Sequence, residues 1–209
     1  MQFYIISPPQ ENKNFHAENF EKISNILPIK FFQFRPKYKN LKKRFEYVKK
    51  YYDSFSNICK KKKIKLIIND DFEIAEKFFF DGIHLGQKDR SCEEAKKKFG
   101  ENFLVGFSCS QSNKLVTKAQ KLGADYLAFG PMFRTKTKQK KEVDHNHILT
   151  ITKRLTMPFV LIGGIDHSNL IHLNKIQPNY IAIINSLWNF NKGPIKSALR
   201  FKEIIKGIA

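Results

Sequence analysis

The stretch from residue 159 to residue 164 reads Phe159-Val160-Leu161-Ile162-Gly163-Gly164, four apolar side chains followed by two glycines. A run of the same kind, Leu66-Ile67-Ile68, occurs in the first half of the chain. Short, unbroken apolar runs are typical of strands that are covered on both faces, as in a parallel sheet flanked by helices. These runs therefore predict an α/β fold built on a parallel sheet.

Strand-like runs recur along the whole chain and alternate with helix-like segments. The candidate strands are residues 3–7, 30–34, 65–69, 82–85, 103–108, 126–130, 159–163 and 180–185. The candidate helices are residues 41–50, 72–79, 91–99, 113–122, 147–155, 168–174 and 194–205. Ser91 and Glu94 have the spacing of a capping box, which marks the start of a helix. Eight strands in a chain of 209 residues predict a single-domain (β/α)8 TIM barrel over residues 1–209, near the lower size limit of that fold.

A doubly wound open sheet is the alternative architecture. That fold usually carries a glycine-rich dinucleotide turn after its first strand. Here Ser7-Pro8-Pro9 occupies that place, so the barrel is favoured.

The composition is that of a soluble globular protein, with 42% hydrophobic and 27% charged residues. The sequence contains no apolar run of membrane-spanning length and opens on a strand-like segment instead of a secretory leader. Cys59, Cys92 and Cys109 match neither a disulfide framework nor a zinc motif. We therefore expect a cytoplasmic protein without a membrane partner.

The formal net charge is +19, from 38 Lys and Arg against 19 Asp and Glu. A strongly basic protein attracts nucleic acid, anionic membranes or phosphorylated ligands. Only six of the basic residues are arginine, however, and arginine is the side chain that base and phosphate readers favour. The lysine runs at residues 60–63 and 96–98 fall on predicted helices or their ends, where a solvated face explains them. We therefore expect no nucleic-acid partner and regard small anionic substrates as compatible with the charge.

Polar residues and glycines gather where the predicted strands end. The C-terminal ends of the strands form the catalytic face of a (β/α)8 barrel. The candidate site residues at or near these positions are Gln33, Arg35, Lys37, Asn69, Asp70, His84, Asp89, Ser108, Thr135, Thr137, Lys138, Gly163, Gly164 and Asn185. Their joint placement predicts an active site at this end.

Asp70 and Asp89 follow neighbouring strands, so their carboxylates are expected to converge on one cation. A site with few protein oxygen ligands suits Mg2+, which keeps waters and binds substrate phosphates. Asp70-Asp71 can equally serve to cap the next helix, and this alternative stays open at the level of the sequence.

The same end of the barrel offers groups that bind phosphate. Arg35, Lys37 and Lys138 supply cations, and Gly163-Gly164 lets backbone amides approach an anion. Each element has a structural alternative: the glycine pair can form a tight turn, and the Thr-Lys-Thr-Lys stretch at 135–138 can be a solvated loop. His84 alternates with two apolar residues and can be either a structural or a functional histidine.

Five motifs, in order along the chain, resemble those of the thiamine-phosphate synthase family, whose relatives include the TenI-like proteins. They are QFRPK at 33–37, LIIND at 66–70, DGIHLGQKD at 81–89, GADYLAFGPMFRTKTK at 123–138 and IGGI at 162–165. The resemblance covers essentially the whole chain, and the motifs at 81–89 and 123–138 are the most specific.

The resemblance implies a (β/α)8 transferase that joins hydroxymethylpyrimidine diphosphate to hydroxyethylthiazole phosphate. The products are thiamine phosphate and diphosphate, and the displacement is dissociative and assisted by Mg2+. It further implies that Asp70 and Asp89 hold the metal and that Arg35, Lys37, Ser108 and Lys138 take part in catalysis. The substrate-binding residues that it implies are Gln33, Arg35, Lys37, Asn69, His84, Ser108, Thr135, Thr137, Lys138, Gly163, Gly164, Ile184 and Asn185.

The chain departs from the family pattern at a few positions of the site, which are Pro36, Lys88, Ser110, Arg134 and Asn185. A TenI-like thiazole tautomerase would use the same barrel without a metal and would rely on a histidine near Ser110, where this chain has none. A barrel that binds phosphorylated ligands without turnover is a second alternative. The sequence leaves open whether the thiazole carries a carboxylate and whether the chain forms a homo-oligomer.

Overall fold

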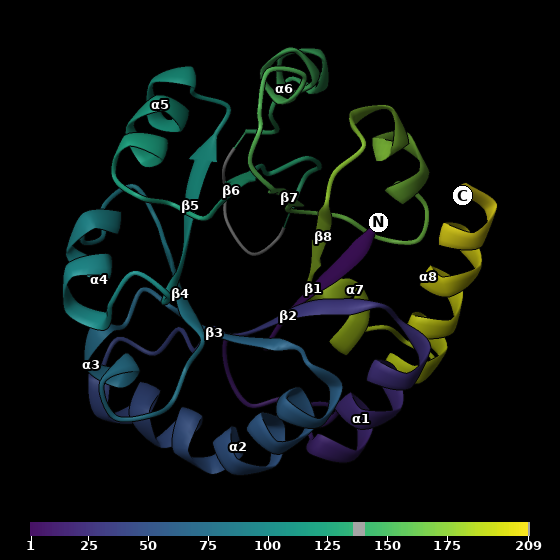
Figure 1. The fold of residues 1–209 in the computed structure, drawn as a ribbon. Helices are drawn as coiled ribbons and strands as arrows, with labels where there is room; N and C mark the ends of the chain where they lie inside the picture. The colour runs from purple at the N-terminus through teal and green to yellow at the C-terminus, as the bar shows by residue number, and fades with distance from the viewer. Residues whose placement is uncertain (136–140, 209) are drawn as a thin grey trace.

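The computed structural model describes residues 1–135 and 141–208. Eight parallel strands form a closed barrel in the order β1 to β8 (Figure 1). The strands are β1 (Gln2–Ile6), β2 (Ile29–Phe34), β3 (Lys65–Asn69), β4 (Gly82–Leu85), β5 (Leu104–Ser110), β6 (Tyr126–Phe129), β7 (Phe159–Ile162) and β8 (Tyr180–Ile183). The predicted (β/α)8 barrel is confirmed, and each of the eight predicted strands overlaps an observed one.

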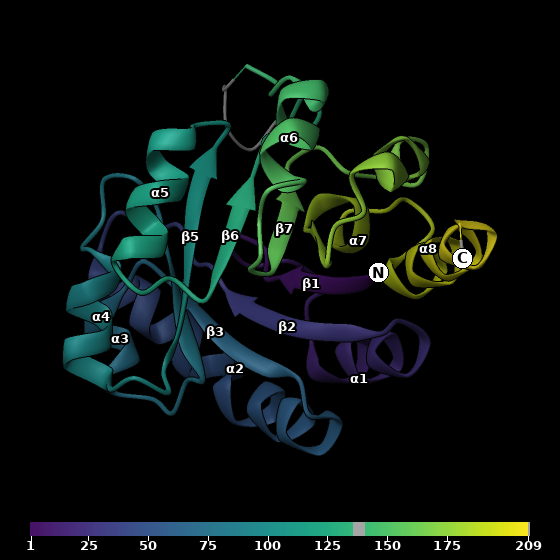
Figure 2. The same ribbon diagram turned by 45° about the horizontal axis from the view of Figure 1, so that its top comes forward.

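Helices ring the barrel on its outside (Figures 1 and 2). They are α1 (Ala17–Ile26), α2 (Leu41–Lys62), α3 (Phe72–Ala75), α4 (Cys92–Phe99), α5 (Asn113–Lys121), α6 (His145–Thr152), the 3-10 helix η1 (Leu170–Ile176), α7 (Asn185–Trp188) and α8 (Pro194–Ile208). None of the helices within the described ranges is both long enough and apolar enough to cross a bilayer. Ser91 and Glu94 form the predicted capping box at the start of α4.

The helical segments differ from the prediction in several places: α2 continues to Lys62, beyond its predicted end at residue 50, and α7 was not predicted. Helix α1 was not predicted, because its buried face consists of only Phe20 and Ile23 and its N-cap is a histidine, His16. Helix α3 ends at Ala75, four residues earlier than expected. The segment after β7 is a 3-10 helix whose buried residues Leu170, Leu173 and Ile176 recur every third position. That spacing matches three residues per turn, so it buries one face of a 3-10 helix.

The apolar residues form two layers because successive side chains of a strand point to opposite faces. Phe3 and Ile5 of β1 pack outward against the helices in the larger cluster, whereas Tyr4 and Ile6 point into the barrel. The inner cluster consists of Tyr4, Ile6, Phe31, Ile67, Tyr126, Ala128, Val160 and Ala182. Five of these residues also line the cavity described below, so the inner cluster forms the floor of the site.

Gly106 of β5 makes room for the ring of Tyr126. A Cβ atom added at Gly106 would lie 2.0 Å from Cζ and 2.3 Å from the hydroxyl oxygen of Tyr126. The Tyr126 ring is 2% exposed and packs between the rings of Tyr4, Phe31 and His84. It therefore has little room to move away.

Gly106→Ala is expected to lower the free energy of unfolding by about 1–3 kcal/mol, the usual cost of overpacking a core. Thermal unfolding should show this as a fall in Tm of several degrees. Gly207→Ala is the matched control, because nothing lies within 4 Å of a Cβ added there. It should leave Tm unchanged or raise it slightly, since alanine favours the helix. Equal Tm values for the two variants would contradict the packing argument.

Candidate active site

A cavity of about 570 Å³ opens at the C-terminal ends of the strands. Ten predicted site residues line it, namely Gln33, Arg35, Asn69, His84, Ser108, Thr135, Gly163, Gly164, Ile184 and Asn185. Asn69, which lines the cavity, is followed directly by Asp70, and Asp70 contacts both Lys37 and Asp89. Thr137 and Lys138 lie outside the described residues.

The carboxyl groups of Asp70 and Asp89 lie within hydrogen-bonding reach of each other. Strands β3 and β4 bring them together, since Asn69 is the register partner of His84 and the amide of Asp70 donates to the carbonyl of His84 at 3.0 Å. The loop after β4 then turns back, so that the amide of Gly86 donates to Oδ2 of Asp89 at 2.7 Å.

The two carboxyl groups have opposite pKa shifts. Burial raises the pKa of Asp89, and the negative charge of Asp70 raises it further. For Asp70, burial acts in the same direction, but the charge and hydrogen bond of Lys37 outweigh it and hold the pKa below its usual value. Two acids in contact repel each other when both are ionised, and a divalent cation between them would remove that repulsion.

The donor set at this pair fits Mg2+. Among residues 1–135 and 141–208, no group of three or more histidine, cysteine or acidic side chains could hold a metal. Two carboxylates leave most of the coordination sphere to water and ligand oxygens, as Mg2+ prefers. The residues therefore suit a cation that is shared with a phosphorylated ligand.

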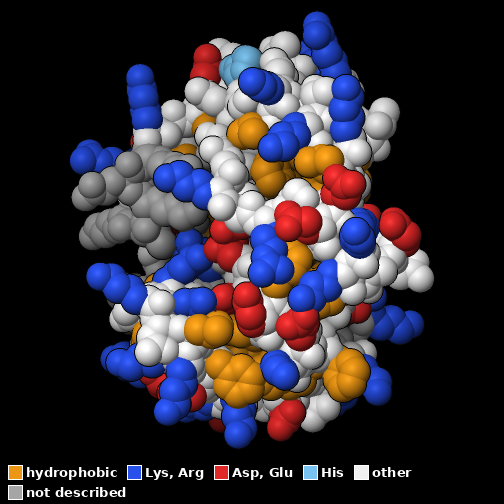
Figure 3. All heavy atoms as spheres, turned by 90° about the vertical axis from the view of Figure 1, so that its left-hand side faces the viewer, with side chains coloured by type: hydrophobic (Ala, Val, Ile, Leu, Met, Phe, Trp, Pro, Cys, Tyr) orange, Lys and Arg blue, Asp and Glu red, His pale blue; other side chains and the backbone are white. Residues whose placement is uncertain are grey.

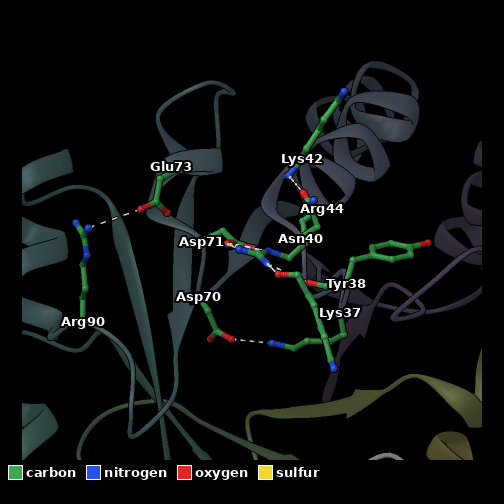
Figure 4. Close-up of polar contacts among 10 residues, drawn as sticks. Lys37, Tyr38, Asn40, Lys42, Arg44, Asp70, Asp71, Glu73 and Arg90 are labelled. Carbon is green, nitrogen blue, oxygen red and sulfur yellow. Dashed lines mark hydrogen bonds and ion pairs between the residues drawn. The ribbon is translucent and has the colours of Figure 1, made fainter.

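Lys37 and Arg44 connect the loop after β2 to the end of β3 (Figure 4). The Nζ atom of Lys37 lies 2.7 Å from Oδ2 of Asp70. Arg44 binds the next carboxylate, with Nη2 2.8 Å from Oδ1 of Asp71 and Nε 3.0 Å from Oδ2. Its Nη1 atom donates to the carbonyls of Tyr38 and Lys39 at 3.0 and 3.2 Å. Arg44 thus fixes the loop that carries Lys37.

The contacts of Asp71 address the alternative that Asp70-Asp71 serves to cap the next helix. Asp71 occupies the N-cap position of α3 but makes no capping hydrogen bond with its side chain. Its carboxylate is engaged by Arg44 instead. The sequence analysis did not identify Arg44 as part of the site surroundings, because nothing in the local pattern pairs a residue of α2 with one that follows β3.

Arg35 and Asn69 line the cavity, and each carries a buried donor that has no partner among the described residues. Arg35 is 8% exposed and Asn69 is 7% exposed. Within the described part of the chain, Nη1 of Arg35 and Nδ2 of Asn69 have no hydrogen-bond partner. Burial lowers the pKa of Arg35, and the charge of Asp70 opposes that shift. Buried donors without acceptors cost free energy, so these atoms indicate a site built for an anionic, oxygen-rich ligand.

Ser186, which directly follows the predicted site residue Asn185, is a third residue of this kind. Its hydroxyl is buried without a hydrogen-bond partner in the described residues, and the side chain lines the cavity at α7.

The glycine pair at the end of β7 holds the loop after β6 close to the strand. Gly163 and Gly164 both have positive φ angles, of 99° and 68°. A Cβ atom added at Gly164 would lie 2.5 Å from the carbonyl oxygen of Phe133 and 2.6 Å from that of Arg134. Glycine adopts this backbone conformation without steric cost. The pair therefore allows the loop that leads to Thr135 to pack against the cavity wall.

His84 points into the barrel. It is 8% exposed, with Nε2 2.9 Å from the hydroxyl of Ser108 and Nδ1 3.3 Å from the hydroxyl of Tyr126. The histidine therefore belongs to the polar floor of the cavity and not to the layer between strands and helices.

Lysine and arginine side chains are scattered over the surface that Figure 3 shows, with acidic side chains among them. Ion pairs between basic and acidic side chains include Lys65 with Asp81, Arg90 with Glu73, and Lys98 with Glu76. The basic charge on this face is thus dispersed and partly paired, which is typical of a solvated surface.

Comparison with known proteins identifies the family. The model of the family described as "Thiamine monophosphate synthase" matches residues 3–187. The chain is 38% identical over 199 residues to a thiamine-phosphate synthase of Pelagibacter ubique (strain HTCC1062), covering 94% of this chain and 93% of the relative. It is 33% identical to one of Lactococcus lactis subsp. lactis (strain IL1403), covering 90% and 88%.

A solved structure titled thiamine phosphate pyrophosphorylase, from Pyrococcus furiosus, shares the fold. Its TM-score is 0.80 at 22% identity, over 99% of this chain and 96% of that one. The resemblance seen in the five sequence motifs is thereby confirmed. On the match over residues 3–187 and the identity to curated relatives, this chain belongs to the thiamine monophosphate synthase family.

Proposed function

We propose that this protein is a thiamine-phosphate synthase, a transferase that joins hydroxymethylpyrimidine diphosphate to hydroxyethylthiazole phosphate. The names of its curated relatives support this activity. The observation that carries the proposal is that Arg35 and Asn69, which line the cavity beside the carboxylates of Asp70 and Asp89, each have a buried donor without a partner among the described residues. Such a set matches a diphosphate that arrives with a divalent cation.

The reaction exchanges one bond for another at the methylene carbon of the pyrimidine. The bond from this carbon to the diphosphate oxygen breaks, and its electron pair leaves with the diphosphate. The lone pair of the thiazole nitrogen then forms the new carbon–nitrogen bond, so the products are thiamine phosphate and diphosphate. No proton has to be removed from the nucleophile, and the enzyme contributes mainly charge and position.

Different residues around the cavity would stabilise the leaving diphosphate and hold the cation. Arg35 and Asn69 would donate to the departing oxygens, and Lys37 would add positive charge from the loop after β2. Asp70 and Asp89 would hold Mg2+, which when bound supplies further positive charge to the diphosphate. The inner cluster closes the floor beneath both substrates.

The phosphate of the thiazole is assigned to the opposite wall of the cavity. Gly164 and Thr135 lie there, beside Asn185 and the unpartnered hydroxyl of Ser186. Thr137 and Lys138 remain sequence-based predictions for this phosphate and for the diphosphate.

The cytoplasmic location and the lack of nucleic-acid and membrane partners also stay predictions.

The test is diphosphate release by the purified protein with both substrates, with and without Mg2+. Release is expected only when both substrates and the cation are present. Isomerisation of a thiazole phosphate without metal would instead support the tautomerase alternative. Binding of both substrates without any product would support a non-catalytic barrel.

A further inference from the structure

Five side chains form one hydrogen-bonded chain across the floor of the cavity. Nε2 of Gln33 donates to the hydroxyl of Tyr4 at 2.7 Å, and the hydroxyls of Tyr4 and Tyr126 lie 2.8 Å apart. Tyr126 then contacts Nδ1 of His84 at 3.3 Å, and Nε2 of His84 contacts the hydroxyl of Ser108 at 2.9 Å. The chain thus runs from β2 through β1 and β6 to β4 and β5, and both of its ends line the cavity.

The direction of donation along this chain follows from one link. Because Gln33 donates to the Tyr4 hydroxyl, the Tyr4 hydroxyl donates in turn to Tyr126. The Tyr126 hydroxyl then donates to Nδ1 of His84. His84 then carries its proton on Nε2 and donates to Ser108. The hydroxyl hydrogen of Ser108 is then available to donate to a ligand in the cavity. The side-chain amide oxygen of Gln33 is available to accept from one. If the side-chain amide of Gln33 were flipped so that its oxygen faced Tyr4, the direction of donation would reverse at every hydrogen bond of the chain.

Burial keeps the two tyrosines of this chain neutral and in place. Burial strongly raises the pKa of Tyr4, and burial followed by the proximity of Tyr4 raises the pKa of Tyr126. Each tyrosine is 2% exposed, and the space beside Gly106 is filled by the Tyr126 ring. With a neutral imidazole at His84, such a fixed chain transmits orientation from one end to the other without transferring net charge.

We propose that Tyr4 and Tyr126 are positioning residues that set the hydrogen-bonding polarity of the cavity floor and thereby select an amino-substituted pyrimidine over an oxo-substituted one. An aminopyrimidine offers a donor in its amino group and acceptors in its ring nitrogens. It therefore matches a floor on which Gln33 accepts and Ser108 donates. In an oxo-pyrimidine the exocyclic group accepts and a ring nitrogen donates, so it would require the whole chain to reverse. This inference rests on the proposed function for the identity of the ring.

The test measures binding of two ligands by calorimetry, hydroxymethylpyrimidine diphosphate and the analogue with oxygen in place of the amino group. The native protein is expected to prefer the amino compound by roughly a hundredfold or more, because the analogue leaves buried polar groups mispaired. In Tyr126→Phe the two ends of the chain are uncoupled, and we expect the preference to fall to roughly tenfold or less. Tyr4→Phe breaks the chain at another link and should have the same effect.

The second measurement is the nitrogen NMR spectrum of the His84 imidazole, which does not depend on any ligand. The native spectrum should show a proton on Nε2 and an acceptor at Nδ1, and the Nδ1 resonance should move in Tyr126→Phe. Tyr47→Phe is the matched control, because Tyr47 is a buried tyrosine that donates to the carbonyl of Pro8 at 2.9 Å, outside this chain. It should change neither the spectrum nor the preference.

Undiminished preference in both Tyr4→Phe and Tyr126→Phe, with an unshifted His84 spectrum, would overturn the inference. If the native protein bound neither pyrimidine, the proposed function would fail. The imidazole spectrum would then still decide whether the chain is coupled, since a shift in Tyr126→Phe supports it and an unchanged spectrum rejects it.

Discussion

Arg35→Met is expected to lower kcat/KM for the pyrimidine diphosphate by about a thousandfold. This is the upper end of the loss in rate seen when one hydrogen-bond donor to a developing negative charge is removed. Arg35 is buried at the cavity wall, and its Nη1 atom has no partner among the described residues. Since negative charge grows on the diphosphate as the bond breaks, the loss should appear more in kcat than in KM. Steady-state diphosphate release at saturating thiazole phosphate measures both constants.

The stability of this variant separates a functional role of Arg35 from a structural one. Methionine removes a buried charge that lacks a complete set of partners, so Tm should be unchanged or higher. Arg154→Met is the control, because Arg154 is exposed, and it should retain native kinetics. A native kcat/KM in Arg35→Met would remove this residue from the diphosphate site.

Asp89→Asn is expected to reduce turnover by on the order of a hundredfold and to raise the Mg2+ concentration needed for half-maximal activity. The physical reason is that an amide keeps the shape of the carboxylate but loses the charge that binds the cation. Asp70→Asn should cost at least as much, because it also removes the partner of Lys37. Initial rates over a Mg2+ titration, with and without chelator, provide the measurement.

The same substitution should not weaken the fold. The pKa of Asp89 is raised by burial and by the neighbouring charge of Asp70, so neutralising Asp89 removes a repulsion in the metal-free protein. Asp53→Asn, on the exposed side of α2, serves as the control and should leave the Mg2+ dependence unchanged. Full turnover in excess chelator would contradict the metal assignment for both acids.

The strands were predictable because their signal is local. A strand such as Phe159–Ile162 is covered on both faces, so nearly every residue is apolar and the run is visible in the sequence alone. Helices gave a weaker signal where little of their surface is buried, as in α1 with Phe20 and Ile23. The 3-10 geometry of Leu170–Ile176 also went unpredicted, because a three-residue spacing of apolar side chains is compatible with an α-helix as well.

The sequence by itself determined the eight strands, the barrel, and the polar residues at the strand ends, because each depends on residue type and order along the chain. The sequence also predicted that Asp70 and Asp89 converge, but the tertiary structure alone decided the other contacts. It tied the loop of Lys37 to β3 through Arg44 and Asp71, and it joined Tyr4 to Tyr126 at 2.8 Å across 122 residues of chain. Contacts between distant residues arise only when the barrel closes, because closure sets the register between strands and the face on which each side chain lies.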